Sequence, residues 1–148
     1  MVPENGKGAR GVSFFAIIAS IYLGANGALQ LAQGGGDMSR KGGAAIRAGW
    51  YASDFLAVEG EAGWMENQAS LALKGLWHWW GYERFDPFFT FGARGWFHKG
   101  DAGPCAGTGF FYHLTDHWSF RADAEATLGL ERDAEMVYML GAGVQYEF

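Results

Sequence analysis

The chain has 148 residues, which favours a single domain, and its formal net charge of −5 gives no basic stripe for binding nucleic acid. It contains 24 glycines, 7 tryptophans and 12 phenylalanines but only 3 prolines, which favours crowded, curved β-structure over a disordered polymer. The single cysteine excludes an internal disulfide, and no Cys/His cluster has zinc spacing, so no metal or cofactor is predicted.

The N-terminal segment, residues 1–19, has the order of a secretory signal, because charged residues precede an apolar run over residues 12–19. A glutamate among the charged residues is unusual for a signal, and the small-x-small triplet Ala25–Gly27 lies inside the first predicted strand. The interpretations that stay open are a segment that directs export, a frayed tail, or a misassigned start. We predict one folded domain over residues 20–148.

From residue 21 onward, apolar residues alternate with small or polar ones in segments separated by short polar or glycine-rich connections. The two-residue period predicts β-strands with one apolar face, and the short connections favour consecutive antiparallel hairpins. The composition of residues 121–136 also suits a helix, but the unbroken alternation over 118–128 favours a strand. The predicted strands cover residues 21–32, 44–52, 55–65, 69–80, 88–98, 105–113, 118–130 and 136–148.

Alternation alone does not say which face is inside, because a soluble barrel and an outer-membrane barrel differ only in which face points outward. The polar face has sparse charges of both signs and little lysine, unlike a soluble exterior. The predicted strands are also long enough to cross a membrane, because a tilted transmembrane strand needs about 9–11 residues. Large aromatic residues near strand ends would form interfacial girdles: Trp50, Trp64, Trp77, Trp79, Phe97, Trp118, Tyr138, Tyr146 and Phe148.

These features predict an all-β protein, an eight-stranded antiparallel up-and-down transmembrane β-barrel. Lipid cannot hydrogen-bond a free strand edge, so the first and last strands must pair, and side chains fill so narrow a lumen. Charges inside it need partners. The set either forms stabilising ion pairs or lines a narrow ion path: Arg47, Glu59, Glu61, Lys74, Arg94, Arg121, Asp123 and Glu125.

Three segments carry a resemblance to a known family: ERFDPFFTFGARG (83–95), YHLTDHWSFRADAE (112–125) and GVQYEF (143–148). They resemble the small eight-stranded outer-membrane β-barrel family, which includes the OmpA, OmpX and OmpW types, and the resemblance covers roughly residues 20–148. It implies location in the cell outer membrane, with the lipid bilayer and lipopolysaccharide as partners.

In that family the assembly machinery reads a last strand with alternating apolar residues and a terminal aromatic, and Val144, Tyr146 and Phe148 match this pattern. The resemblance therefore implies an assembly signal at these residues. The OmpW type also implies a narrow, porin-like channel for small or hydrophobic solutes. We expect a monomer with a structural or surface-interaction role; the alternatives are that channel and a soluble lipid-binding barrel with the opposite facing.

Catalysis is not predicted. His117, Ser119 and Glu125 resemble the residues of outer-membrane lipid A deacylases, but His117 and Glu125 are eight residues apart on one strand, about 26 Å. The asparagine that follows the serine in those enzymes is Phe120 here. Scattered histidines are interpreted as interfacial rather than as metal ligands: His78, His98 and His113. Charges predicted in outward loops could contact lipopolysaccharide, divalent ions or a host surface: Asp37, Arg40, Lys41, Lys99, Asp101, Glu131, Arg132, Asp133 and Glu135.

Overall fold

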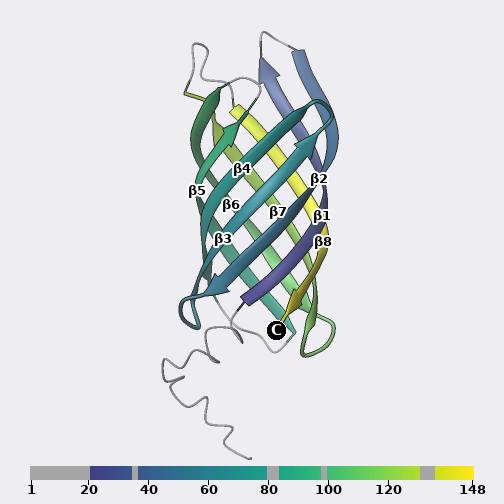
Figure 1. Ribbon diagram of the computed structural model, residues 1–148, viewed down its shortest axis with the longest axis vertical. Coiled ribbons are helices and arrows are strands. Elements are labelled where there is room, and N and C mark those ends of the chain that lie inside the picture. The colour runs from purple at the N-terminus through teal and green to yellow at the C-terminus, as the bar shows by residue number, and fades with distance from the viewer. Residues whose placement is uncertain (1–20, 35–36, 80–83, 98–99, 131–135) are drawn as a thin grey trace, which may run out of the picture.

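The computed structural model describes residues 21–34, 37–79, 84–97, 100–130 and 136–148, and these form eight strands. Each strand pairs antiparallel with the next, and β8 pairs with β1 to close a barrel, as predicted (Figure 1). Within these residues no helix is long and apolar enough to cross a membrane. The strands are β1 (Ile21–Gly34), β2 (Asp37–Tyr51), β3 (Leu56–Met65), β4 (Gln68–His78), β5 (Phe85–Trp96), β6 (Asp101–His113), β7 (Trp118–Leu128) and β8 (Met136–Glu147).

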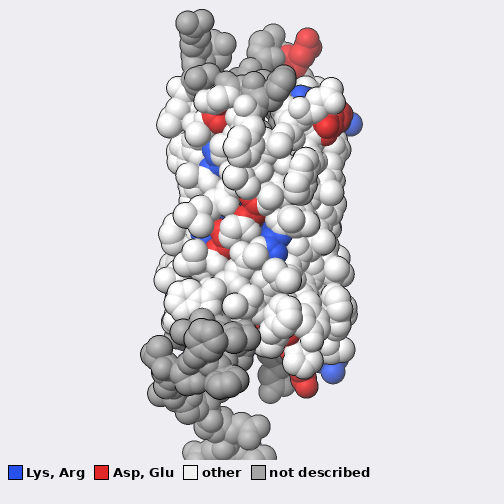
Figure 2. Space-filling view, in the orientation of Figure 1, with Lys and Arg blue, Asp and Glu red and all other residues white. Residues whose placement is uncertain are grey.

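The apolar face of each strand points outward. The Leu71 and Phe91 side chains are 51% and 54% exposed, whereas Arg94 is 2% exposed. Most of the exterior between the two rims of the barrel is uncharged, and a few charged atoms of both signs are visible at mid-height (Figure 2). The predicted facing is confirmed, and it is the reverse of what a water-soluble lipid-binding barrel requires.

Exposed aromatic residues lie at both ends of the cylinder. We call the end at which β8 finishes the lower end, as drawn in Figure 1, and the opposite end the upper end. Because successive strands run in opposite directions, Trp50 and Trp118 lie at the lower end, and Trp64 and Tyr138 at the upper end. Such belts are typical of barrels whose ends meet the two membrane–water interfaces.

Several predicted connections are strand instead. The connection between the first two predicted strands was expected to be a glycine-rich loop over residues 34–43. This is wrong for residues 37–43, because β2 begins at Asp37 and pairs with β1 from there. Likewise, β5 begins at Phe85, inside a predicted turn, and β6 begins at Asp101. Continuing the ladder pairs backbone groups that a loop would leave to water, and this outweighs the low strand propensity of glycine.

Some predicted loop charges therefore belong to strands. Asp37, Lys41 and Asp101 line a cavity at the upper end, and Arg40 is an exposed strand residue. The possible signal segment, residues 1–19, and His98 lie outside the described residues. So do the remaining predicted loop charges: Lys99, Glu131, Arg132, Asp133 and Glu135.

The closing seam between β8 and β1 depends on a close backbone approach. A Cβ atom at Gly143 would lie 2.1 Å from the carbonyl oxygen of Ala25 in β1, closer than any real contact. Glycine is therefore required here for the two strands to pair at this spacing.

The sequence pattern suggested a lumen that is polar along its whole length, but the structure shows otherwise. Near the lower end the lumen holds a compact apolar cluster below the charged residues. The cluster consists of Tyr22, Ala57, Leu76, Phe88 and Phe111, each at most 1% exposed.

Candidate functional site

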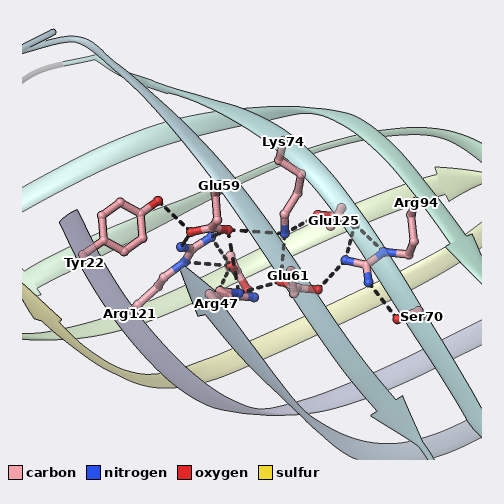
Figure 3. Close-up of polar contacts among 10 residues, drawn as sticks. Tyr22, Arg47, Glu59, Glu61, Ser70, Lys74, Arg94, Arg121 and Glu125 are labelled. Atoms are coloured by element: carbon pink, nitrogen blue, oxygen red, sulfur yellow. Dashed lines mark hydrogen bonds and ion pairs between the residues drawn. The ribbon is translucent and has the colours of Figure 1, made fainter. Parts of the chain in front are cut away.

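Eight charged side chains meet in the lumen at mid-height, and they are the eight that the alternation placed inside (Figure 3). We call them the plug. Four are basic and four acidic, so their formal charges sum to zero, and each side chain is at most 7% exposed. The plug consists of Arg47 from β2, Glu59 and Glu61 from β3, Lys74 from β4, Arg94 from β5, and Arg121, Asp123 and Glu125 from β7.

Part of the plug follows from hairpin register. Arg47 stands directly opposite Glu61 in the β2–β3 pair, and its Nε lies 2.5 Å from Glu61 Oε2. Glu59 stands opposite Lys74 in the β3–β4 pair, with 3.6 Å between Oε1 and Nζ. Facing residues of opposite charge are the favourable arrangement on one face of a sheet.

The remaining ion pairs join β7 to the opposite wall. Arg121 donates to both carboxylate oxygens of Glu59, and Arg47 Nη1 lies 2.9 Å from Asp123 Oδ2. Strand β7 is hydrogen-bonded only to β6 and β8, so these pairs cross the lumen.

A second group of contacts closes the same region. Glu125 Oε2 lies 3.1 Å from Lys74 Nζ, and its Oε1 lies 2.8 Å from Arg94 Nη2. Glu61 receives Lys74 Nζ at 2.8 Å and Arg94 Nη2 at 2.6 Å. The eight side chains thus form one connected network.

Neutral groups complete the network, and the sequence analysis did not identify them. The Tyr22 hydroxyl donates to Glu59 Oε2 at 2.8 Å, and Arg94 Nη1 donates to Ser70 Oγ at 3.2 Å. The guanidinium of Arg121 lies 4.8 Å from the centre of the Phe88 ring, within cation–π range. The neutral residues Tyr22, Ser70 and Phe88 all belong to the inward-facing series of their strands, and this position is the signal that could have identified them.

The plug packs tightly against the wall that contributes no charge to it. A Cβ atom at Gly141 in β8 would lie 2.5 Å from Asp123 Oδ1. On the side of Asp123 and Glu125, a cavity beside Arg94 has a volume of about 10 Å³, whereas a hollow on the outer face, lined by Leu71 and Leu73 and also reaching Arg94, has a volume of about 890 Å³. The smaller cavity is at the lower limit for a single water molecule.

The structure does not bring together His117, Ser119 and Glu125, the three residues that resemble those of lipid A deacylases. Ser119 Oγ lies 2.8 Å from His113 Nδ1, while His117 Nδ1 lies 2.9 Å from the carbonyl oxygen of Glu147. Within the described residues, no group of three or more His, Cys, Asp or Glu side chains is placed to hold a metal ion.

His78 is a correction to the sequence analysis. It was expected at the membrane interface, but its side chain is buried in the lumen, with Nδ1 2.7 Å from Asp86 Oδ2. The reason is its strand phase, because His78 continues the inward-facing series of β4.

The three predicted assembly residues lie on the outward face of β8. Val144 and Phe148 are 49% and 51% exposed, and the backbone N–H of Phe148 donates to the carbonyl oxygen of Ile21 at 3.1 Å. The Tyr146 ring packs edge-on against Trp118, with 5.0 Å between ring centres. The end of β8 is thereby held at the seam with its aromatic residues directed away from the lumen.

No protein-family model matches this sequence, and no curated protein is found to be similar to it. Solved structures do share its fold. Neisserial surface protein A (NspA) superposes with a TM-score of 0.66 at 16% sequence identity, over 86% of this chain and 97% of that one. The outer membrane protein OprG from Pseudomonas aeruginosa gives a TM-score of 0.65 at 13% identity, over 89% and 97%.

Ail, the attachment invasion locus protein of Yersinia pestis, superposes with a TM-score of 0.63 at 13% sequence identity, over 87% of this chain and 97% of that one. The chain therefore has the fold of the small eight-stranded outer-membrane β-barrels, as the sequence resemblance implied. A fold of this kind hosts many roles, so the role has to be argued from the residues of this chain.

Proposed function

We propose that the protein is an integral outer-membrane β-barrel with a closed lumen and a structural or surface-interaction role, without catalytic activity. The observation that carries the proposal is the electrically neutral plug, which ties β7 to the opposite wall. Buried charges are costly unless they are paired, and this set is fully paired. A network of this kind suits a rigid cylinder better than a path for solutes.

Residence in the outer membrane is supported by the exterior. In the closed barrel every strand pairs with a neighbour on each side, which is the condition for a β-structure in hydrocarbon. The outward face is apolar, with aromatic residues at both ends. Two of the structural neighbours are a surface protein and an attachment protein by name, which supports a role at the cell surface.

Conductance measurements in planar bilayers test the closed lumen. The refolded protein should insert and give no single-channel steps, because the cavity beside the plug is about 10 Å³. The charge-neutral double variant Arg94→Ser/Glu125→Ser removes one basic and one acidic side chain, and with them three ion pairs, and opens space at mid-height, so it should conduct. The matched control Arg40→Ser/Glu66→Ser also removes one basic and one acidic residue, but both are exposed, and it should stay closed.

Steps in the unmodified protein would overturn the closed lumen in favour of the narrow channel. A gel-shift assay tests the barrel separately, because a folded barrel in unboiled sample runs faster than boiled protein. Solubility without detergent would contradict membrane residence.

The assembly signal is part of the same proposal. Val144, Tyr146 and Phe148 present an outward-facing apolar edge at the end of β8, where an insertion machinery could recognise it before closure. Lipopolysaccharide around the upper end is the lipid partner that an outer-membrane location supplies.

A further inference from the structure

The upper end of the lumen contains a cavity that the plug does not use. Its volume is about 310 Å³, within the range of small-ligand sites. Its walls combine polar and aromatic side chains from five strands, most of them on the inward phase. They include Gln30 from β1, Asp37 and Lys41 from β2, Gln68 from β4, Trp96 from β5 and Asp101 from β6.

One side-chain oxygen at this cavity is buried without a hydrogen-bond partner. Gln30 is 5% exposed, and its Oε1 atom accepts no hydrogen bond. It lines the cavity, with Lys41 directly opposite in the β1–β2 pair. A buried amide oxygen without a donor destabilises a fold, so a ligand in the cavity that donates a hydrogen bond to Gln30 Oε1 would relieve this cost.

The lining chemistry narrows the ligand class. One lysine and two aspartates give the cavity a formal charge of −1, which disfavours phosphate and other anions. The positively charged ammonium group of Lys41 repels a simple cation, so the cavity does not favour that class of ligand either. Hydroxyl groups both donate and accept, so they can pair with Gln30 Oε1, with carboxylates and with an ammonium group.

Trp96 supplies the remaining element of the site. It is 6% exposed and forms part of the wall of the cavity, where the apolar face of a sugar ring can pack on an indole. We propose that this upper cavity binds a neutral saccharide of one or two rings. The inference rests on the proposed surface-interaction role and gives it a ligand class.

The connection between β3 and β4 at the upper end consists of only Glu66 and Asn67. With lipopolysaccharide around the upper end, as proposed above, this end faces the cell exterior, where glycans are found.

Ligand binding should be measured on the full chain refolded in a phosphocholine detergent, because maltoside and glucoside detergents would compete. Saturation-transfer NMR with maltose and lactose as probes should show saturable binding in the millimolar range. Gln30→Leu removes the unpaired acceptor and should weaken binding about tenfold. Trp96→Leu should abolish it, and Trp96→Phe should retain part of it.

Gln145→Leu is the matched control. Gln145 is also buried, at 3% exposure, with an unpaired Oε1, but it lies at the lower end and does not line the upper cavity. It should leave saccharide binding unchanged. The gel-shift assay confirms that each variant is folded, and should Trp96→Leu not fold, the comparison of Gln30→Leu with Gln145→Leu decides.

Absence of saturable binding by either sugar would overturn the inference, as would equal losses in Gln30→Leu and Gln145→Leu. Inorganic phosphate and spermidine serve as comparison probes, and tighter binding of either would overturn the ligand class. These failures are distinct from failure of the proposed function, which would show as channel steps or as solubility without detergent.

Discussion

Replacing Glu61 by glutamine removes the charge that three cations share. Glu61 receives Arg47 Nε at 2.5 Å, Arg94 Nη2 at 2.6 Å and Lys74 Nζ at 2.8 Å. Glutamine has nearly the same size, so the packing stays while the plug changes from neutral to a formal charge of +1. The substitution therefore isolates the electrostatic contribution.

The expected effect on the free energy of unfolding is a loss of about 3–5 kcal/mol. Each attraction is worth roughly 6 kcal/mol at an effective dielectric constant of about 20, but the cost of desolvating the carboxylate cancels much of it. Removing one partner leaves the cations buried and under-compensated, because the Glu61 side chain is 1% exposed. Urea unfolding of the refolded protein in phospholipid vesicles, followed by tryptophan fluorescence, measures the change.

Two companion variants make the result interpretable. Glu66→Gln makes the same chemical change at an exposed turn residue and should alter stability by less than about 0.5 kcal/mol. Adding Lys74→Met to Glu61→Gln restores neutrality, so the double variant should be more stable than the sum of the single effects by about 1–3 kcal/mol. If Glu61→Gln and Glu66→Gln behave alike, the plug does not stabilise the barrel.

Three further predictions concern the wall and its end. Gly143→Ala forces the β8–β1 seam apart and should lower the urea midpoint, whereas Gly27→Ala, which meets nothing within 4 Å, should not; equal midpoints would contradict the close approach. Phe148→Ala should reduce the heat-modifiable form in cells but not after refolding in detergent, and equal losses in both would argue against an assembly signal. Cys105 is 4% exposed, so a bulky maleimide should label it only after unfolding, and rapid labelling of the folded barrel would place it elsewhere.

The barrel could be predicted because its determinants are local. The alternation in each segment sets which residues face lipid and which face the lumen, and a one-residue shift would reverse every side chain. The exclusion of free edges from hydrocarbon then requires closure. Strand ends were predicted less well, because glycine-rich stretches such as residues 37–43 have low local propensity for strand and become strand only through pairing with a neighbour.

The sequence by itself indicated the eight charges of the plug, four basic and four acidic. The facing pairs Arg47–Glu61 and Glu59–Lys74 come from the strand register that the structure shows. Only the tertiary structure decided that Arg121 meets Glu59, and that Gln30 and Trp96 line one cavity. Contacts across the lumen depend on the stagger and tilt with which eight strands close, a property of the whole cylinder that no single segment contains.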